Sequence, residues 1–458
     1  MGVKAINLRA SITSKGLRLS YGKKNFALEY PSKIWKAYPR KNMKILVDNL
    51  AYLLTINVPL VSKFRKVVYN TSKPFFEKEF KRVVFEGIPS ACNDYNQNTK
   101  DLIEKFLSTK VVFKDDRVKK PSWDKEMGEK TIIPLSCGKD SLLTLAVAKE
   151  AGMDLIAVYI IDTVSPPENK IKIKHAKKLC KEQGIPLVFL KNSIEQLNDF
   201  ETWDTKETCL GYMHMITGFC FISLPLMHYY GADKVLIGNQ KDMDFHFINN
   251  EDIVTWPSPD QTTRATKEQH KMIQKMTDGR AGVYSIISPL TNIAITKILN
   301  HRYPKFAKYQ VSCDCLDVCD ETRWCHDCNK CARLSLFTHA VDKSVKHIGF
   351  KHNLLDKKHE KHYALFKGRE VDHYEMNVEA RDQQLLGFLM AYRAGVKGYL
   401  IDKFKKKYLK EAKQREKELR KKFFKVYSAR LPRKFKKKIV SIYKEEMKEW
   451  GLIKHTST

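Results

Sequence analysis

The sequence predicts an α/β protein whose centre is a doubly wound parallel sheet. Between residues 131 and 240, short and nearly continuous apolar stretches alternate with stretches of helical spacing. Strands of this kind are typical of parallel sheets that helices cover on both faces, and ligands of such sheets bind at the carboxyl ends of the strands. The chain has 458 residues, too many for one ordinary core, so we expect further segments on both sides.

The elements of this core follow one another along the chain. Strands are expected at residues 131–135, 154–161, 185–190 and 234–238, with helices at 141–151 and 169–184. The very apolar stretch 209–230 contains His214, Pro225 and His228. Its polarity and the strand that follows it predict a helix buried against the sheet rather than a membrane span.

We divide the chain into four segments. They are an N-terminal α+β module (1–130), the domain with the parallel sheet (131–310), a cysteine-rich segment (311–340) and a basic helical C-terminal region (341–458). In the first segment, residues 17–21 and 25–30 alternate like a hairpin and residues 44–54 have an apolar helical face, which indicates an independent module. In the last, apolar side chains recur at helical spacing on both sides of Pro432, so two helices are expected to dock on their own protein.

Positive charge is concentrated at the two ends of the chain. The net charge is 83 − 52 = +31; residues 1–130 contribute 27 − 13 = +14 and residues 402–458 contribute 21 − 7 = +14. Basic flanks fit a nucleic-acid groove, and tRNA is one candidate partner, but a lysine-rich composition that only keeps the protein soluble gives the same counts. The first 22 residues lack an apolar secretory run, so we expect a cytoplasmic protein with no membrane association.

Six of the 11 cysteines fall between residues 313 and 331. A long chain without an export signal is expected to keep its thiols reduced, and this spacing favours a metal site. We predict that Cys313, Cys325, Cys328 and Cys331 bind a structural Zn²⁺ through four thiolates, with Cys315 and Cys319 as other candidates for the first ligand. An iron–sulfur cluster and unliganded structural thiols remain alternatives, although the ferredoxin spacing would need a cysteine where the chain has Ser335.

The first strand of the core ends in a loop that suits a phosphate chain. A short turn that contains glycine, between a buried strand and a helix, directs backbone N–H groups toward an anion at the positive end of the helix. The loop consists of Ser136, Cys137, Gly138, Lys139, Asp140 and Ser141. A Walker A loop is excluded because its first glycine would fall on Ile133, and an ordinary capped turn remains the structural alternative.

The loop has the pattern Ser-x-Gly-x-Asp-Ser and lies between a strand and a helix. This arrangement resembles the signature of the PP-loop ATP pyrophosphatases. The usual form is Ser-Gly-Gly-x-Asp-Ser, and Cys137 stands in place of its middle glycine. The resemblance implies an adenine nucleotide alpha-hydrolase-like fold that binds Mg²⁺·ATP, transfers AMP to a carboxylate or carbonyl oxygen and releases pyrophosphate. It also implies that Ser136, Lys139, Asp140 and Ser141 act on the phosphates, that Asp162 and Thr163 lie near the adenosine, and that Gly238, Asn239 and Gln240 lie where the second substrate enters.

Two branches of this superfamily share further features with the chain. The cysteine spacing and the nearby Arg333 are similar to those of 7-cyano-7-deazaguanine synthase. The long segment before the loop, together with the stretches 237–240 and 288–297, is similar in character to the ATP-dependent UDP-muramoyl-dipeptide glutamate epimerase. Both branches imply that ATP activates a small-molecule carboxylate as an acyl-adenylate. A tRNA-modifying enzyme and a noncatalytic nucleotide-binding module are the alternatives.

Two loops after the last strand carry polar side chains. Asp242, Asp244 and His246 are expected to lie in a solvated loop, because three such ligands without a fourth are common by chance. The stretch 256–264 is expected to face the substrate, with Arg264 and Lys267 available to phosphate or carboxylate.

Overall fold

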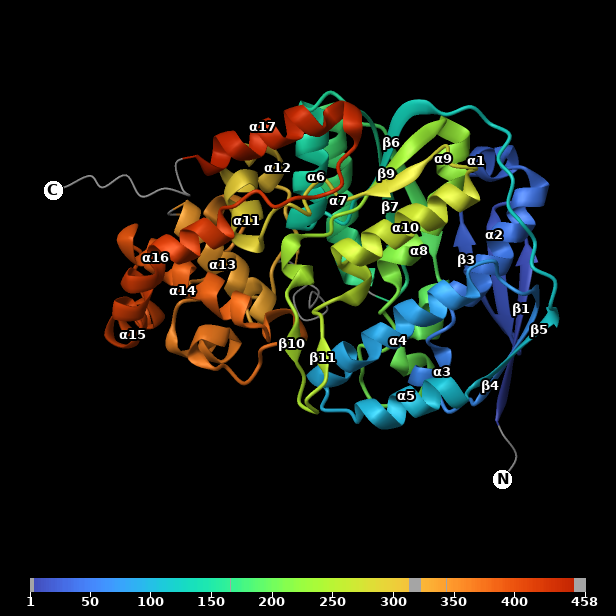
Figure 1. Cartoon of the computed structure of the whole chain (residues 1–458), viewed down its shortest axis with the longest axis horizontal. Coiled ribbons are helices and arrows are strands. Elements are labelled where there is room, and N and C mark those ends of the chain that lie inside the picture. Colours follow the sequence, from blue (N-terminus) through green and yellow to red (C-terminus); the bar gives the residue numbers. More distant parts are fainter. Residues whose placement is uncertain (1–3, 165, 313–322, 343, 449–458) are drawn as a thin grey trace.

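The fold is organised around one 10-stranded sheet with the strand order β12-β9-β6-β7-β8-β3-β2-β1-β4-β5 (Figure 1). The computed structural model describes residues 4–164, 166–312, 323–342 and 344–448. The strands are β1 (Ala5–Ile12), β2 (Gly16–Tyr21), β3 (Lys24–Glu29), β4 (Lys66–Ser72), β5 (Lys110–Asp115), β6 (Gly128–Pro134), β7 (Asp154–Asp162), β8 (Leu187–Asn192), β9 (Ala232–Leu236) and β12 (Gly282–Tyr284). A separate two-stranded sheet consists of β10 (Phe247–Ile248) and β11 (Val254–Thr255).

The part of the sheet that the sequence predicts is parallel throughout. Strands β12, β9, β6, β7 and β8 pair in parallel, which confirms the α/β class and the four expected strands and adds β12. Helices α6 (Lys139–Glu150) and α7 (Pro166–Gln183) follow β6 and β7 as expected. Both sheet faces are buried here, since Ile133 and Ala157 belong to one hydrophobic core and Ile132 and Ile156 to the other.

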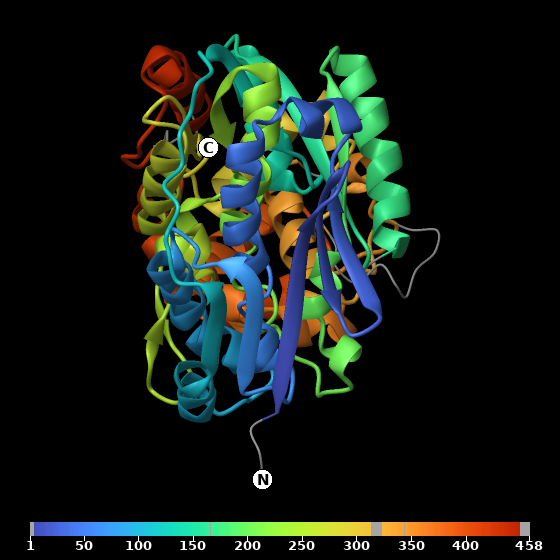
Figure 2. The ribbon, with the colours of Figure 1, turned by 90° about the vertical axis from the view of Figure 1, so that its right-hand side faces the viewer.

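The N-terminal segment continues this sheet. The expected hairpin forms as β2 and β3, and β3 pairs antiparallel with β8 through Leu28 and Asn192. Strand β1 pairs antiparallel with β2 and parallel with β4, and β4 pairs parallel with β5 (Figure 2). Side chains of β1–β3 share a hydrophobic core with Ile132 and Val158, so residues 1–130 form neither a separate sheet nor an independent core.

The helices that share the hydrophobic core of β1–β3 cover one face of the sheet. They are α1 (Ser32–Ala37), α2 (Arg40–Leu53), α3 (Val58–Val61), α4 (Glu77–Asp94), α5 (Thr99–Ser108), α8 (Met215–Ile222), α9 (Leu224–Tyr230) and α10 (Thr263–Met276). The stretch 209–230 provides α8 and α9 and is buried, as expected. The stretch Arg40–Val61 is long and apolar enough to cross a membrane by length and composition. Its most apolar 18 residues are 94% buried inside the protein, which is typical of a core helix.

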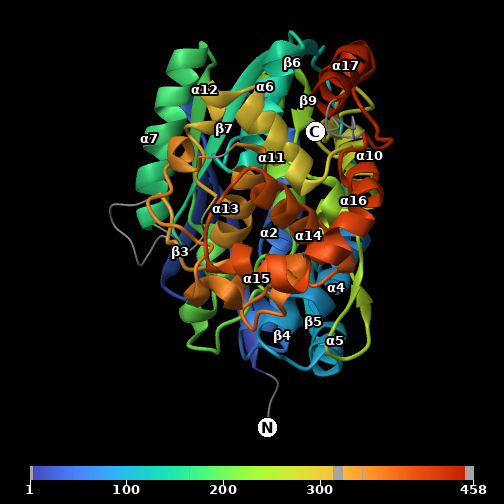
Figure 3. The same ribbon diagram turned by 90° about the vertical axis from the view of Figure 1, so that its left-hand side faces the viewer.

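Helices of the second half pack against the other face and lie together in Figure 3. They are α11 (Asn292–His301), α12 (Pro304–Ala307), α13 (Asn329–Val341), α14 (Val378–Arg393), α15 (Tyr399–Lys407), α16 (Leu409–Phe423) and α17 (Lys436–Met447). The expected apolar stripes are buried through Phe404, Leu419, Ile439 and Tyr443, so these helices dock on their own protein. The stretch before Pro432 forms two helices rather than one, because α15 ends before Tyr408 and α16 begins after it.

A buried ion pair holds the last helix in place. Lys297 of α11 donates to a Glu446 carboxylate oxygen at 2.9 Å, and their side chains are only 2% and 8% exposed. We expect Glu446→Leu to lower the free energy of unfolding by about 3–5 kcal/mol, because it leaves the Lys297 charge buried without its carboxylate. Adding Lys297→Met should recover most of this loss in urea unfolding. Equal stability of Glu446→Leu and the wild type would contradict this role.

Candidate functional site

The loop from Ser136 to Ser141 connects the central strand β6 to α6 at the carboxyl edge of the sheet. Cys137 has φ +58°, the left-handed region that favours glycine, at the position where the PP-loop signature has glycine. Its side chain is fully buried and its thiol lies 3.6 Å from the Lys172 carbonyl oxygen. Burial raises the pKa of this thiol to about 12. Cys137 therefore contributes backbone geometry to the loop, and its sulfur faces the core.

Donor groups gather at the mouth of the loop. The amide N–H of Gly138 donates to Ser136 Oγ at 3.3 Å, and the hydroxyls of Ser136 and Ser141 are also 3.3 Å apart. The amide of Lys139 donates to Ser312 Oγ at 3.1 Å. A Cβ on Gly138 would lie 3.3 Å from Ser136 Oγ, so a side chain there would crowd these hydroxyls. The Ser141 hydroxyl also donates to the Gly138 carbonyl, at 3.0 Å, so the N–H and hydroxyl groups at the first turn of α6 bond within the loop and would have to exchange these bonds for those of an entering anion.

Lys139 supplies a buried positive charge beside this turn. Its Nζ donates to Asp140 Oδ1 at 2.6 Å and to Gln240 Oε1 at 3.0 Å, and the residue is 5% exposed. Burial lowers the pKa of Lys139, while the neighbouring Asp140 and Asp242 carboxylates oppose the shift. A cation held in this way interacts strongly with any anion that enters, because little solvent screens it.

The end of β9 closes the loop from the other side. A Cβ on Gly238 would lie 3.2 Å from the Asp140 Cβ, so only glycine allows this approach without displacing Asp140. Asn239 is 1% exposed; its Nδ2 donates to Thr266 Oγ1 at 2.9 Å, and its Oδ1 has no hydrogen-bond partner among residues 4–164, 166–312, 323–342 and 344–448. With Gln240 bound to Lys139, the predicted residues of β6 and β9 meet at one edge of the sheet.

Asp162 and Thr163 lie at the adjacent strand end. Asp162 Oδ1 accepts from the amide of Val164 at 3.0 Å, and its carbonyl accepts from the Asn169 side chain at 2.6 Å. The half-buried Glu195, which follows β8, interacts electrostatically with the Asp162 carboxylate. Burial and, to a smaller extent, Asp162 raise the pKa of Glu195 to about 8. Sequence reasoning missed Glu195, since no local pattern indicates that a carboxylate after β8 faces β7.

Glu195 makes stability depend on pH. Its pKa is raised from 4.5 to about 8, so over this window the folded chain keeps a proton that the unfolded chain releases, and stability falls as pH rises. We expect Glu195→Gln, which keeps the acceptor for Asn192, to raise the free energy of unfolding near pH 9 by on the order of 1–2 kcal/mol and to have no such effect near pH 5. Urea unfolding at both pH values measures this, with the exposed Glu201→Gln as the control. An unchanged pH dependence would contradict the burial of an uncompensated Glu195.

Asp242 is buried, although the loop after β9 was expected to be solvated. It is 7% exposed, its Oδ2 accepts from the amide of Asn292 at 2.7 Å, and its other oxygen accepts from the Gln383 side chain. The Asp244 carboxylate accepts a hydrogen bond from the amide of Thr263 at 2.7 Å, so it also has a partner within the protein. The prediction was wrong for Asp242 because its partners, in α11 and α14, follow it by 50 and 141 residues. His246 is exposed, as expected.

The stretch 256–264 also differs from its prediction. Arg264 pairs with Glu86 of α4 and lies over the Trp256 ring, with 5.8 Å from its guanidinium carbon to the ring centroid. Its charge is therefore compensated within the protein. Thr266, two residues later, accepts the hydrogen bond from the Asn239 side chain.

Arg333 brings a second buried cation toward the loop. It belongs to α13, and its Nη1 lies 2.7 Å from Glu375 Oε1. Burial alone would lower the pKa of Arg333, but Glu375, Asp372, Asp242 and Asp140 attract its charge and the pKa is raised. Its Nε has no hydrogen-bond partner among the described residues (4–164, 166–312, 323–342 and 344–448). The sequence indicated Arg333 only as a residue near the cysteines; the fold also brings it within electrostatic range of Asp140.

Three of the four predicted metal ligands come together. The sulfur atoms of Cys325, Cys328 and Cys331 lie within 4.8 Å of one another, at the start of α13. The amide of Asp327 donates to Cys325 Sγ and the amide of Cys331 donates to Cys328 Sγ, both at 3.4 Å, as is favourable for thiolates. This cluster could hold a metal ion. Cys313, Cys315 and Cys319 lie outside the described residues.

Residues 310–312 contact both the loop and Arg323, which precedes the cysteine cluster in sequence. The amide of Val311 donates to the carbonyl of Cys137 at 2.8 Å, next to the contact between Ser312 and Lys139. The Arg323 guanidinium donates to the carbonyl of Gln310 at 3.2 and 2.6 Å. Ordering residues 323–331 around a metal would therefore support the wall of the loop.

A comparison of the chain with protein-family models finds no match, and neither does a comparison with curated proteins. Fold and site define an α/β protein with a Rossmann-like sheet. It carries a strand-to-helix loop at the carboxyl edge and a three-cysteine cluster that could hold a metal beside it.

Proposed function

We propose that the protein is a PP-loop ATP pyrophosphatase that activates a carboxylate-bearing small molecule as an acyl-adenylate. One observation carries the proposal: the loop from Ser136 to Ser141 combines N–H and hydroxyl donors with the buried Lys139 at the carboxyl end of the central strand. Ligands of open α/β sheets bind at this edge, where the strand order changes direction. Strand β6 lies at that point, between β7 and β9.

In the proposed reaction, a carboxylate oxygen of the substrate attacks the α-phosphorus of ATP. The bond from that phosphorus to the bridging oxygen of the β-phosphate breaks, and pyrophosphate leaves with the electron pair. A nucleophile then displaces AMP, or a base removes the acidified α-proton before AMP is lost. Lys139, Ser136 and Ser141 would hold the pyrophosphate and stabilise charge that develops on it.

The Asp140 carboxylate is suited to Mg²⁺, which prefers carboxylate and phosphate oxygens. Its side chain is 33% exposed at the loop, so a cation could reach it from solvent. Bound Mg²⁺ would neutralise phosphate charge. Asp162 and Thr163, one strand away, are the candidates for adenosine contacts, and Asn239 with its unpaired Oδ1 is the candidate for a substrate N–H or O–H.

Zn²⁺ is the proposed metal of the cysteine cluster. The donor set fits, because three clustered cysteine sulfurs, two of which accept amide N–H groups, suit a soft tetrahedral ion. Cys325, Cys328 and Cys331 would hold it, with Cys313 as the proposed fourth ligand. Four protein ligands would leave no open position, so the metal would stabilise the fold around the loop and would not take part in the reaction.

Pyrophosphate release from Mg²⁺·ATP tests the proposal. The zinc-replete full chain is assayed with a deazaguanine carboxylate, a UDP-muramoyl dipeptide and bulk tRNA in parallel. Stimulation by either carboxylate supports acyl-adenylate formation and names the substrate class. ATP binding without stimulation by any of the three would favour a noncatalytic nucleotide-binding module.

A tRNA-modifying enzyme is the second candidate, and the C-terminal helices favour it. Their apolar faces are buried, and lysines occupy much of the outward surface of α15 and α16, including Lys406, Lys410, Lys413 and Lys417. Such a surface binds phosphates in a salt-dependent manner. Binding of tRNA that weakens steeply with salt, together with tRNA-stimulated pyrophosphate release, would place this function first.

A further inference from the structure

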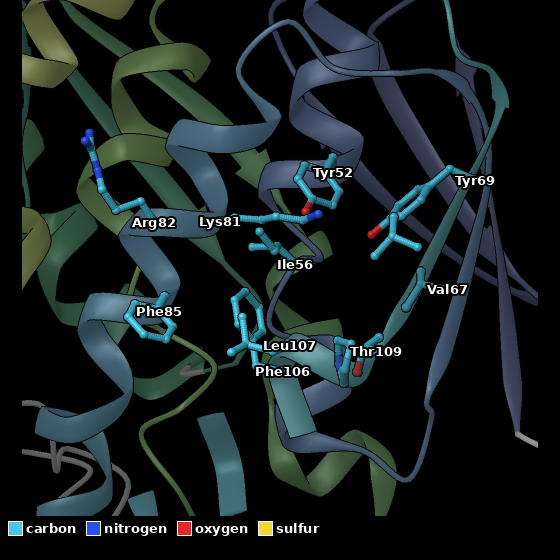
Figure 4. Close-up of a pocket in the computed structure, with 12 residues that line it drawn as sticks. Tyr52, Ile56, Val67, Tyr69, Lys81, Arg82, Phe85, Phe106, Leu107 and Thr109 are labelled. Atoms are coloured by element: carbon cyan, nitrogen blue, oxygen red, sulfur yellow. The ribbon is translucent and has the colours of Figure 1, made fainter. Parts of the chain in front are cut away.

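A pocket in the N-terminal half shares no residue with the site described above. Its volume is about 370 Å³, within the range of ~300–1,000 Å³ that is typical of small-molecule sites. Side chains of α2, α3, α4, α5, β4 and β5 surround it (Figure 4). The lining residues are Tyr52, Ile56, Pro59, Val67, Tyr69, Lys81, Arg82, Phe85, Phe106, Leu107, Thr109 and Val111.

Apolar side chains at this pocket are left in contact with water. Phe85 is 39% exposed and Leu107 is 66% exposed, and both lie at the pocket. Large apolar side chains that are exposed around a hollow mark a surface where a ligand gains free energy by excluding water. The wall of the pocket is thus suited to an apolar chain.

One polar group of the lining has no partner. Tyr52 is 1% exposed, and its hydroxyl has no hydrogen-bond partner among residues 4–164, 166–312, 323–342 and 344–448. The hydroxyl of Tyr69, another lining residue, is 2.8 Å from Thr55 Oγ1. Burying an unpaired hydroxyl is unfavourable, so a ligand that offers a polar atom would relieve the cost at Tyr52.

The charges at Lys81 favour an anion. Lys81 and Lys73 share the single carboxylate of Glu77, at 2.7 and 3.0 Å, which leaves this group of three with one uncompensated positive charge. Lys81 lines the pocket, and its side chain is 47% exposed. Arg82 is paired with Glu268 of α10, so its charge is already compensated.

We propose that this pocket binds a single-chain amphiphile, a fatty-acid-type carboxylate. Its chain lies against Phe85, Phe106 and Leu107, and its head group pairs with Lys81. A flexible chain suits a lining that six helices and strands contribute, and one carboxylate matches the one uncompensated charge. This binding site does not depend on the function proposed for the loop.

Isothermal titration calorimetry of the full chain tests the proposal, with dodecanoate kept below its micellar concentration and dodecanol below its solubility limit. Dodecanoate is expected to bind about two- to fivefold more tightly than dodecanol, as for one partly exposed charge pair. Lys81→Gln should remove this preference and leave dodecanol binding unchanged. It should not disturb the fold, because Glu77 retains Lys73.

Leu107→Ser tests the apolar wall, with Val378→Ser as its matched control. The two side chains are exposed to nearly the same extent, at 66% and 67%, and only Leu107 lines the pocket. Leu107→Ser should weaken both ligands about fivefold, and Val378→Ser should weaken neither. Absence of dodecanoate binding, equal binding of the two ligands by the wild type, or equal effects of the two serine variants would overturn the proposal.

Discussion

Replacing Lys139 by methionine is expected to lower the rate of pyrophosphate release at least about a hundredfold. Lys139 is the buried cation of the loop, bound to Asp140 and Gln240, and methionine keeps much of its length without the charge. The interaction with pyrophosphate strengthens as negative charge develops on the leaving group, so the loss should fall mainly on kcat. Steady-state assays with an excess of Mg²⁺·ATP measure it.

Lys149→Met is the matched control for this variant. Lys149 belongs to the same helix, but its Nζ donates to the carbonyl of Gln183 on the surface. Lys139→Met should also fold, because the carboxylate that it leaves without its partner, Asp140, is 33% exposed and stays solvated. Full activity of Lys139→Met, or an equal loss in the two variants, would contradict the role of the loop.

Loss of the cysteine cluster is expected to have the second large effect. Cys328→Ser and Cys331→Ser each remove a thiolate, so we expect the purified protein to lose its bound Zn²⁺ and several kcal/mol of stability. The contacts of Val311 and Ser312 with the loop should weaken as well, which predicts a higher KM for ATP in these variants. Metal analysis, thermal unfolding and ATP titration measure the three effects.

Cys209→Ser is the control for the cysteine variants. Cys209 is partly buried, like Cys325 and Cys328, and does not belong to the cluster. It should leave metal content and the KM for ATP unchanged. Wild-type protein that carries no zinc when purified from zinc-replete medium, or Cys328→Ser with full metal content, would contradict the assignment of the cluster.

The sequence was sufficient to locate the central elements of the fold. Strands β6, β7, β8 and β9 lie where uninterrupted apolar stretches predict them, because the apolar residues of each strand are buried or half-buried on both faces of the sheet. Strand β12 was not predicted, since Gly282–Tyr284 is too short to give a pattern. The junction of β3 with β8 was not predicted either, because it joins segments more than 160 residues apart and no local signal marks it.

The candidate site was predictable only where it is local. The loop from Ser136 to Ser141 is recognisable because one continuous segment supplies the turn, the donors and the cation. Ser312, Gln383 and Glu195 reach the site or its surroundings from distant parts of the chain. Asp242 was misassigned for the same reason, since the distant Gln383 makes its burial favourable.

The fate of a labelled carboxylate oxygen tests the central claim most directly. The substrate that stimulates pyrophosphate release is prepared with heavy oxygen in its carboxylate and incubated with the protein and Mg²⁺·ATP. Formation of an acyl-adenylate predicts that one heavy oxygen appears in AMP, because the carboxylate oxygen that attacked the α-phosphorus leaves with it. Formation of ADP and inorganic phosphate, with no label in AMP, would contradict the account.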